Sequence, residues 1–460
     1  MVANPAAPPA FGYAAGEAAR TLGRTALGPA LQAVRRRTLQ LSNAFEASLG
    51  PGLPVPCTDE LNPPLWELGH IGWFADWWIA RNPQRAWGLQ ADPLAQRQPA
   101  RQAARGVDAD ALYNSSTVPH TSRWALDLPD AEHTRADLAA SLADTLALLD
   151  TAADDDQGLY FFRLALFHEA MHAEAGVYMA QTLGLDPFAA GAEPLPAQDT
   201  QGHPPAILHG AGETVPHRIG GASDPARHTA GAVGGSVPAA PSRANGPPLR
   251  VPAQAWTLGW SGPGFAFDNE LGPHTVALDA FEIDAQAVRW AQFLPFVTDG
   301  GYAQRSHWSA AGWAWRQQHS TGLPRYLRRG AHGWEQRRFG RWQPLNLDDV
   351  ATHLSAFEAE AWCRWAGRRL PTEAEWEAAA CSTPGFRWGE AWEWTASPFA
   401  PFPGFVPHPY RDYSAPWFDG RPVLKGASPA TLPLMRHPRY RNYFPAGRND
   451  IVAGFRSAAI

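Results

Sequence analysis

A change in composition at residues 187–250 divides the chain into two parts with different patterns. This stretch is rich in Gly, Pro, Ala and Ser and has little hydrophobic periodicity. Such a composition is typical of a linker or an insertion. We therefore predict two domains, at residues 27–186 and 251–460, with residues 187–250 between them and a flexible N-terminus at residues 1–26. A chain of 460 residues also favours more than one domain.

The first part has the periodicity of helices. Apolar residues recur at helical spacing, as in the stripe Leu138, Leu142, Leu146 and Leu149. Gly184 suits the end of the last helix. Four helices in this order predict a bundle, and the long connection at residues 83–130 is typical of a functional loop. The expected helices are 26–49, 63 or 64 to 81, 131–153 and 159–183.

The second part predicts short strands and much loop, with many Trp and Gly residues. Two helices are expected in it, one near residues 355–366 and a shorter one after Pro371. Thr372 can cap the second of these, and Glu373 and Glu375 lie in its first turn, where a helix favours negative charge. The fold class we predict is α+β and multidomain.

Charge and cysteine content exclude several classes of protein. The net charge is −6 and no long Lys/Arg run occurs, so we expect no nucleic-acid partner. Three cysteines are too few for a disulfide framework and fit a reducing compartment. We see no signal peptide and no apolar run long enough to span a membrane, so we expect a cytoplasmic protein. The oligomeric state cannot be predicted.

The strongest local motif is His168-Glu169-Ala170-Met171-His172 on the fourth predicted helix. Histidines four residues apart project from one helix face, which suits two ligands of one metal ion. His70 lies on the second predicted helix and can face this pair across a bundle. Chance alone gives about half such a pair among 16 histidines, so the pair by itself is weak and a buried, hydrogen-bonded pair is the alternative.

The same motif also occurs in zinc proteases, where the Glu is the general base. That interpretation needs a third ligand, yet no His follows His172 until His203, which leaves Glu169 or Glu174. Three neutral imidazoles would instead leave positions open for O2 and a substrate, a variant of the facial triad of non-heme iron(II) enzymes.

Five stretches of the second part form a recognisable set, at residues 267–270, 365–377, 392–395, 423–428 and 454–456. By these stretches, together with His70 and the HExxH pair, the chain resembles the ergothioneine-type sulfoxide synthases. Members of that family join a DinB-like four-helix bundle, which carries a distal His and the HExxH pair, to a formylglycine-generating-enzyme-like domain of C-type-lectin-like fold. The resemblance covers about residues 27–186 and 251–460. Formylglycine generation itself relies on cysteines near the C-terminus. No Cys follows Cys381 here, so that activity is disfavoured.

The resemblance implies iron(II) at His70, His168 and His172, and O2 as co-substrate. It implies that a chalcogen donor is joined to the imidazole of hercynine, the trimethylated betaine of histidine. Tyr410 matches the tyrosine of the family that supplies a proton. Tyr413, Asn442 and Tyr443 match substrate contacts, and aromatic faces such as Trp417 can hold a trimethylammonium group.

Several positions depart from the family pattern. Met171 stands where a Gln often holds the betaine, and Phe444 stands where an acid is associated with the amine of a γ-glutamyl-cysteine donor. In the loop, only Arg123 is a strong candidate clamp for donor carboxylates. Asn114, Ser115 and Ser116 would instead suit sugar hydroxyls.

This pattern resembles the selenoneine-synthase branch of the family, which uses a selenosugar donor. We therefore expect C–Se bond formation on hercynine. Two alternatives stay open. One is ergothioneine-type C–S bond formation and sulfoxidation with γ-glutamyl-cysteine or cysteine. The other is a non-catalytic or zinc-binding DinB-type binding protein.

Overall fold

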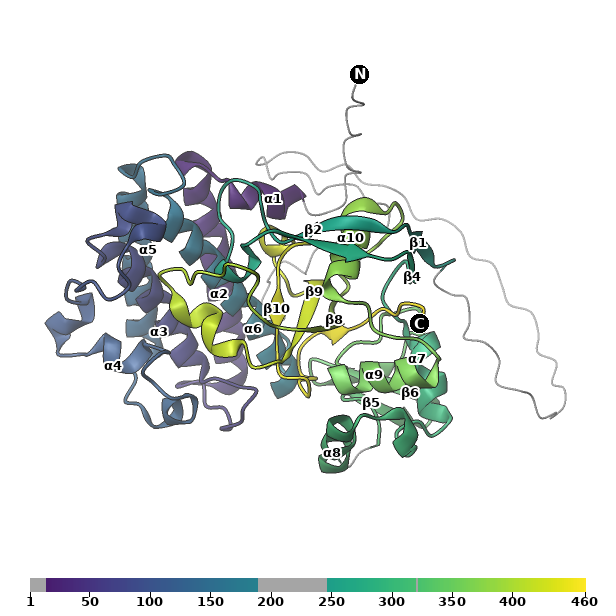
Figure 1. Ribbon diagram of the computed structural model, residues 1–460. Coiled ribbons are helices and arrows are strands. Elements are labelled where there is room, and N and C mark those ends of the chain that lie inside the picture. Colours follow the sequence, from purple (N-terminus) through teal and green to yellow (C-terminus); the bar gives the residue numbers. More distant parts are fainter. Residues whose placement is uncertain (1–13, 189–245, 320–321) are drawn as a thin grey trace, which may run out of the picture.

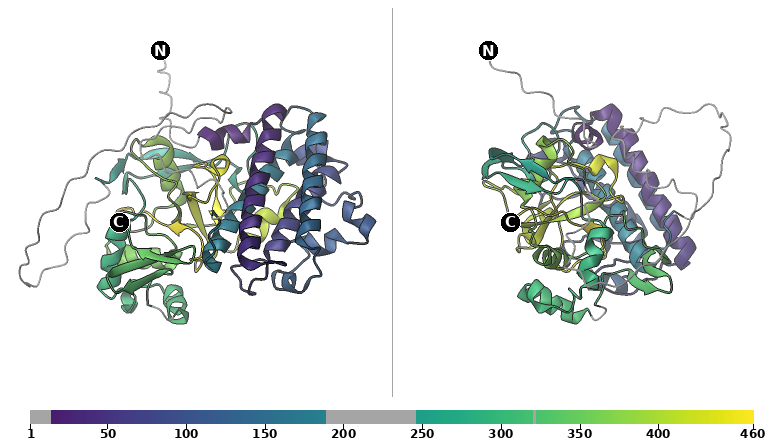
Figure 2. Two further views of the ribbon diagram at one scale, coloured as in Figure 1. Left: turned by 180° about the vertical axis from the view of Figure 1, so that it is seen from behind. Right: turned by 90° about the vertical axis from the view of Figure 1, so that its right-hand side faces the viewer.

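The computed structural model describes residues 14–188, 246–319 and 322–460. Helices make up the N-terminal part, and short strands with a few helices make up the C-terminal part. The two parts pack side by side (Figures 1 and 2). Residues 1–13 of the predicted flexible N-terminus and residues 189–245 of the predicted linker lie outside the described residues.

The N-terminal part contains the four long helices that the periodicity predicts, within a few residues of the expected bounds. They pack against one another beside the C-terminal part (Figure 1). The elements of this part are α1 (Ala14–Arg20), α2 (Arg24–Leu49), α3 (Pro64–Ala75), the π-helical η1 (Asp76–Ala80), the 3-10 helices η2 (Arg85–Gln90) and η3 (Arg101–Arg105), α4 (Ala109–Tyr113), the 3-10 helix η4 (His120–Ala125), α5 (Ala131–Asp150) and α6 (Tyr160–Leu183).

The predicted flexibility of residues 14–26 is wrong. These residues form α1 and the start of α2, and Arg20 is buried. The Arg20 guanidinium donates to both carboxylate oxygens of Glu270, at 3.1 and 2.6 Å, and lies 4.7 Å from the centre of the Trp260 ring. Both partners lie far along the chain, so no local pattern could indicate that this segment is ordered.

The C-terminal part holds one four-stranded sheet in the order β10-β9-β8-β11, in which β11 runs parallel to β8 and the other pairs are antiparallel. Two antiparallel pairs, β1-β4 and β2-β3, and the antiparallel β5-β6-β7 sheet complete the strands of the described residues. The strands are β1 (Leu249–Val251), β2 (Gln254–Leu258), β3 (His274–Leu278), β4 (Phe281–Ile283), β5 (Leu327–Gly330), β6 (Gly333–Arg338), β7 (Arg341–Pro344), β8 (Ala391–Pro398), β9 (Pro422–Ala427), β10 (Asn442–Tyr443) and β11 (Ala453–Gly454).

Both helices that the sequence predicts here are present, and Thr372 caps the second as expected. Ser355 accepts a hydrogen bond from the Glu358 amide at the start of α9, and Thr372 does the same for Glu375 in α10. Helices α7 and α8 were not predicted. The helical elements of this part are η5 (Asp268–Glu270), α7 (Trp290–Thr298), η6 (Arg305–His307), α8 (Ala310–Gln318), α9 (Ala356–Trp365), α10 (Glu373–Ser382), η7 (Arg411–Tyr413), η8 (Ala415–Trp417) and η9 (Pro433–Met435).

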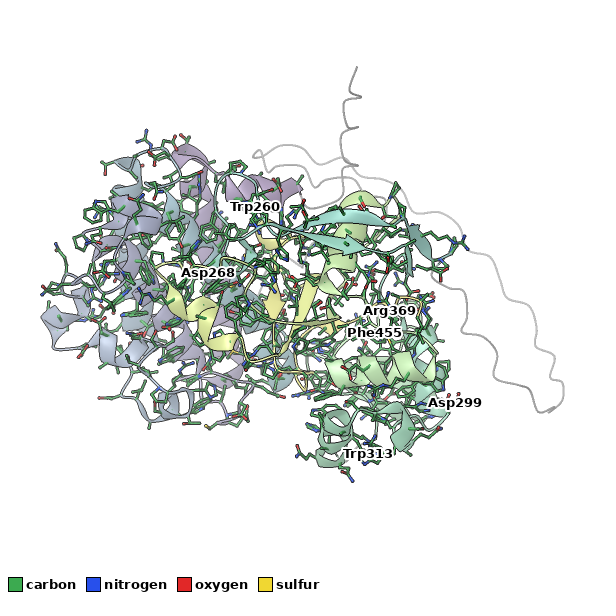
Figure 3. The ribbon with its side chains drawn as sticks, viewed as in Figure 1. Trp260, Asp268, Asp299, Trp313, Arg369 and Phe455 are labelled. Carbon is green, nitrogen blue, oxygen red and sulfur yellow. The ribbon has the colours of Figure 1, made fainter. Side chains whose placement is uncertain are left out.

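The core of the C-terminal part is aromatic. Phe455, labelled in Figure 3, lies 5.3 Å from Trp362 of α9 and 6.3 Å from Phe293 of α7, measured between ring centres. All three rings are buried. These contacts join the segment after β11 to two helices, which explains why a part with so little regular secondary structure has a continuous core.

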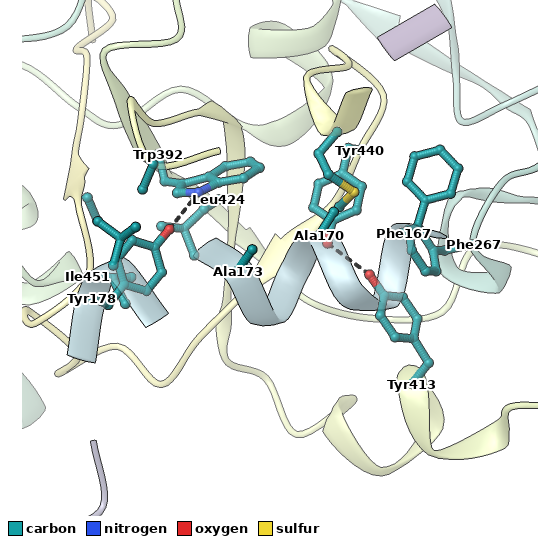
Figure 4. Close-up of a cluster of buried hydrophobic side chains, with 14 of the residues drawn as sticks. Phe167, Ala170, Ala173, Tyr178, Phe267, Trp392, Tyr413, Leu424, Tyr440 and Ile451 are labelled. Atoms are coloured by element: carbon teal, nitrogen blue, oxygen red, sulfur yellow. Dashed lines mark hydrogen bonds between the residues drawn. The ribbon is translucent and has the colours of Figure 1, made fainter. Parts of the chain in front are cut away.

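Helix α6 is where the two parts meet. One of its faces packs on α2 and α3, and another packs on the C-terminal part. Figure 4 shows Phe167 and Ala170 of α6 beside Tyr413, Tyr440 and other buried residues of the C-terminal part. Because both faces are covered, the orientation of this helix is set by contacts with both parts of the protein. Among the described residues, no helix is long and apolar enough to cross a membrane.

Two histidines outside α3 and α6 have a pKa that burial lowers. Burial, followed by the nearby charge of Arg325, lowers the pKa of His353 to about 4. Burial also lowers the pKa of His408 to about 4. The Tyr160 hydroxyl lies 3.1 Å from His408 Nδ1, and burial raises the pKa of Tyr160, so this hydroxyl donates to an unprotonated ring nitrogen.

We predict that the protein loses stability as the pH falls from about 6.5 to about 4. In this window the unfolded chain has protonated both histidines and the folded protein has not, so protons favour unfolding by on the order of 1–3 kcal/mol for each group. Denaturant midpoints measured at half-unit pH steps check this. His408→Asn should reduce the slope of stability against pH, and an unchanged slope would contradict the assignment.

Candidate metal centre

Three imidazoles from two helices converge at one point. His70 lies on α3, and His168 and His172 lie one turn apart on α6. The His168 Nε2 atom lies 3.2 Å from Nε2 of His70 and 3.1 Å from Nε2 of His172. Among the described residues, these three form the cluster with the geometry to hold a metal ion. The structure therefore brings together the three residues that the sequence singled out.

Hydrogen bonds at the opposite ring nitrogens orient two of the three imidazoles. His70 Nδ1 donates to the backbone oxygen of Tyr113 at 2.8 Å, and His172 Nδ1 donates to the carboxylate of Glu67. Gly69 permits the first contact, because a Cβ there would come within 2.3 Å of the Tyr113 ring. Both rings are thereby held in the tautomer that leaves Nε2 without a proton.

This arrangement fits a cation better than a group of free histidines. With Nδ1 of His70 and of His172 acting as donors, both Nε2 lone pairs point at Nε2 of His168, which can carry at most one proton. At least one of these two nitrogens is therefore left without a hydrogen-bond donor. Metal–nitrogen bonds of about 2.1 Å at angles of roughly 90–109° would separate the nitrogens by about 3.0–3.4 Å, which matches the separations here.

Aromatic rings cover two of the three imidazoles. The Phe74 ring stacks on His168 at 3.5 Å with an interplanar angle of 4°, and Trp66 stacks on His70 at 4.8 Å. Burial, followed by the charge of His172, lowers the pKa of His70 to about 3, and burial lowers the pKa of His168 well below its usual value. Both rings are therefore neutral near pH 7, the form that binds metals.

The Glu of the HExxH motif does not reach the cluster. Glu169 forms a buried ion pair with Arg35 of α2, at 2.7 Å from Nε, and accepts a hydrogen bond from Thr38 at 2.8 Å. Both of its oxygens are occupied on the α2 side. In this geometry Glu169 is neither a ligand nor a general base, which removes the zinc-protease interpretation.

Glu174, the other carboxylate considered as a ligand, faces the C-terminal part. Its Oε1 atom accepts hydrogen bonds from the side chains of Trp392 at 2.7 Å, Ser428 at 3.0 Å and Thr431 at 2.6 Å, and from the Tyr178 hydroxyl. This group therefore anchors α6 to the segments around β8 and β9. A metal in the cluster would have three protein ligands and open positions.

Tyr410 reaches the cluster from the C-terminal part. Its ring lies edge-on to His168 at 6.2 Å and to Phe74 at 5.0 Å. Burial, followed by the charge of Asp412, raises the pKa of Tyr410 to about 12, against the opposing effects of a hydrogen bond with Ser115 and the charge of Arg123. The hydroxyl therefore keeps its proton at neutral pH and can donate it.

The loop residues singled out by the sequence lie near Tyr410, although several are already engaged. The Ser115 side chain forms a hydrogen bond with Tyr410, and the Ser116 hydroxyl donates to Asp412. Asn114 uses Oδ1 to accept from the Ser116 amide at 3.1 Å. Arg123 stacks on Trp66 at 3.8 Å. The loop at residues 83–130 therefore contacts the segment that carries Tyr410.

Four tyrosines form an aromatic group beside the cluster. Tyr413 lies 6.1 Å from Tyr410 and 6.2 Å from Tyr443, and the Tyr443 hydroxyl donates to the Tyr413 backbone oxygen. The Tyr413 hydroxyl lies 2.9 Å from that of Tyr440, which in turn donates to the Met171 sulfur at 3.4 Å. Met171 therefore lies at the contact between α6 and these tyrosines.

Three of the candidate substrate-binding residues are bonded to or packed on residues other than the histidines. Asn442 pairs with β9 and accepts from the Tyr443 amide, and Phe444 lies 5.1 Å from the Arg448 guanidinium. Trp417 is 40% exposed and donates to the backbone oxygen of Asp412. Within the described part of the chain, no hydrogen bond or ring contact joins any of the three to the histidines.

Three residues around the histidines were not predicted from the sequence: Glu67, Asn62 and Tyr440. Glu67 lies three residues before His70 on α3, so helical spacing could have indicated a carboxylate on the face that carries the histidine. Asn62 precedes the helix, and its partners become visible only in the fold. Tyr440 carries no signal of its own in the sequence.

Comparisons with known proteins match both parts of the chain. Residues 248–390 match the family model of the sulfatase-modifying factor enzyme 1-like domain. The chain is 30% identical over 491 residues to "Hercynine oxygenase" of Mycolicibacterium smegmatis, covering 95% of this chain and 99% of the relative. It is 30% identical over 489 residues to the protein of the same name from Mycolicibacterium thermoresistibile, covering 95% of each chain. "Formylglycine-generating enzyme" of Streptomyces coelicolor is 36% identical over 177 residues, 33% of this chain and 56% of the relative.

We predict that Glu169→Gln lowers stability but leaves the metal centre intact. Loss of the carboxylate charge leaves Arg35 buried without its counter-ion, which costs about 3–5 kcal/mol. Denaturant unfolding measures this loss, and metal analysis after anaerobic loading with iron(II) should still find one ion per chain. His168→Ala, the adjacent control, should lose the metal. A Glu169→Gln variant that folds normally and binds no metal would show that Glu169 is a ligand.

Proposed function

The chain belongs to the hercynine oxygenase family, and on that premise we propose that it is an O2-dependent non-heme iron enzyme that forms a C–Se bond between hercynine and a selenosugar donor. The helical part would be a DinB-like four-helix bundle and the C-terminal part a formylglycine-generating-enzyme-like domain of C-type-lectin-like fold. The observation that supports this most is the convergence of three imidazoles, of which His70 and His168 are neutral, on one point beside a protonated tyrosine.

His70, His168 and His172 would hold iron(II), which when bound supplies the one-electron chemistry that O2 requires. The chain itself contributes geometry. Glu67 and the Tyr113 carbonyl keep Nε2 of two ligands free of protons, and Phe74 and Trp66 exclude water from the ligand rings. Exclusion of water limits stray oxidation of the protein.

Tyr410 would be the proton donor. Its pKa of about 12 keeps the hydroxyl protonated at neutral pH, and its ring is edge-on to His168. The bond to Ser115 would orient it, which links the loop at residues 83–130 to the reaction. A proton donor held beside the metal ligands needs no large movement during turnover.

Hercynine would bind on the side of the aromatic group, with its trimethylammonium group against the faces of Tyr413 and Tyr443 and the Met171 side chain at the wall. A quaternary ammonium cannot donate a hydrogen bond, so aromatic faces are suitable partners for its charge. Asn442 and Trp417 are proposed contacts at the edge of this site.

The donor would be uncharged at the end that meets Phe444 and the loop. Phe444 offers no carboxylate for a donor amine, and Arg448 beside it is paired with Asp450 at 2.5 and 2.7 Å. Asn114, Ser115 and Ser116 can bind hydroxyl groups of a sugar. Synthesis of a C–S bond from γ-glutamyl-cysteine or cysteine is the second candidate, favoured by the hercynine oxygenase relatives.

We further propose a cytoplasmic location.

A donor competition tests the chalcogen. Enzyme loaded with iron(II) receives hercynine, O2 and equal amounts of a 1-selenosugar and γ-glutamyl-cysteine, and mass spectrometry identifies the products. We expect the selenium product alone, because the proposed donor site lacks an acid for the amine. A sulfur product alone would assign the chain to C–S bond formation. No product from either donor, with His70→Ala as the inactive control, would count against hercynine as substrate.

We predict that Tyr410→Phe keeps the metal and the substrates but turns over about 10²–10⁴-fold more slowly, the usual range when a positioned proton donor is lost. Metal content and hercynine affinity, measured by titration, should stay near those of the unchanged protein because the ring is retained. Tyr443→Phe is the matched control, since its hydroxyl binds a backbone oxygen. Equal effects of the two substitutions would contradict a proton-donor role for Tyr410.

A further inference from the structure

We propose that Arg123 and Asn62 act through Glu67 to hold His172 in the orientation and tautomer that the metal requires, so that Arg123 is a positioning residue of the metal centre and not a direct clamp for the donor. This inference rests on the proposed metal site. It assigns a role to three residues outside the histidine cluster, two of which carry no motif in the sequence.

A continuous chain of hydrogen bonds joins the three residues to the cluster. The Arg123 Nη1 atom donates to Asn62 Oδ1 at 2.8 Å, and Asn62 Nδ2 donates to Glu67 Oε1 at 2.6 Å. The other oxygen of Glu67 accepts from His172 Nδ1. Both oxygens of the Glu67 carboxylate are therefore used, one by His172 and one by Asn62. We call the hydrogen-bonded chain of Arg123, Asn62 and Glu67 the relay.

The partners of Asn62 fix the orientation of its side-chain amide. Turning the Asn62 amide by 180° would place its NH2 group against a guanidinium and its oxygen against a carboxylate, which loses both hydrogen bonds. Asn62 is therefore the adaptor between a cation and an anion that do not touch. With Nδ1 of His172 donating to Glu67, Nε2 of the same ring stays free of a proton and faces the cluster.

Arg123 also supports a second ligand by stacking. Its guanidinium lies 3.8 Å from the centre of the Trp66 ring, and that ring stacks on His70 at 4.8 Å and 8°. Trp66 is held in turn by donating Nε1 to the Leu112 backbone oxygen at 2.7 Å. One arginine therefore contacts the surroundings of two metal ligands, through a hydrogen-bonded relay on one side and a stack on the other.

The guanidinium is engaged at Nη1 and on one face, and its Nε atom is buried without a hydrogen-bond partner. Nη1 is bound to Asn62, one face covers Trp66, and Nη2 makes a long contact of 3.5 Å with the Val118 backbone oxygen. A bidentate carboxylate clamp needs two parallel N–H groups that a substrate can reach, and the unpaired Nε is closed to solvent. The buried charge of Arg123 instead balances that of Glu67, whose carboxylate lies among the imidazoles.

Metal affinity separates positioning from clamping. Cobalt(II) is the probe, because its visible absorption band reports ligand geometry and its binding can be measured by anaerobic competition with a coloured chelator. The substitutions Glu67→Gln and Asn62→Asp keep the size and shape of the side chains, and Arg123→Lys keeps the charge but loses the planar fork and the stack. Arg105→Gln is the matched control, since Arg105 pairs with Asp137 at the surface of the same loop.

We expect Glu67→Gln and Asn62→Asp to weaken cobalt(II) binding by about 10–100-fold, the usual effect of losing a hydrogen-bond partner of a metal-binding histidine. Arg123→Lys should weaken it in the same direction and shift the absorption band, whereas Arg105→Gln should change neither. Melting temperatures measured in parallel identify any variant that fails to fold, and the remaining substitutions of the relay then decide.

Two results would contradict the inference. If Arg123→Lys binds cobalt(II) with unchanged affinity and spectrum but raises the KM for the donor, Arg123 is a clamp and the inference is overturned. Unchanged affinity in Asn62→Asp would likewise remove the relay. Failure of the proposed function would look different, because the unsubstituted protein would then bind no metal or bind it without acting on hercynine.

Discussion

The burial of α6 between the two parts of the protein is the constraint on which the rest depends. Two carboxylates hold this helix from different sides: Glu169 pairs with Arg35 of α2, and Glu174 accepts four hydrogen bonds from side chains. Five residues along a helix turn it by about 140°, so the two anchors lie on different faces and leave α6 little freedom to rotate. His168 and His172 are thereby aimed at α3.

The candidate metal centre lies at this junction and needs both parts. The helical part supplies the three imidazoles, the carbonyl of Tyr113 and the carboxylate of Glu67. The C-terminal part supplies Tyr410, whose ring lies edge-on to His168. Neither part by itself contains both the three histidines and the proposed proton donor, which gives a physical reason for their extensive packing.

Polar interactions buried at the junction are satisfied in pairs or networks. The Arg20–Glu270 pair ties α1 to the C-terminal part, and the hydroxyls of Tyr413 and Tyr440 meet at 2.9 Å beside Met171. Buried charges without partners would cost several kcal/mol each, so these contacts favour one relative placement of the two parts. Precise placement is what a reaction between two bound substrates requires.

Much of the helical part could be predicted from the sequence alone, because helical periodicity, capping residues and the i,i+4 spacing of His168 and His172 are local properties. Thr372 marked a helix start for the same reason. The tertiary structure decided the rest. It brought His70 to a residue 98 positions away, paired Glu67 with His172 over 105 positions, and ordered α1 through Glu270. Contacts of that separation follow from how buried faces pack, and no local pattern of residues encodes them.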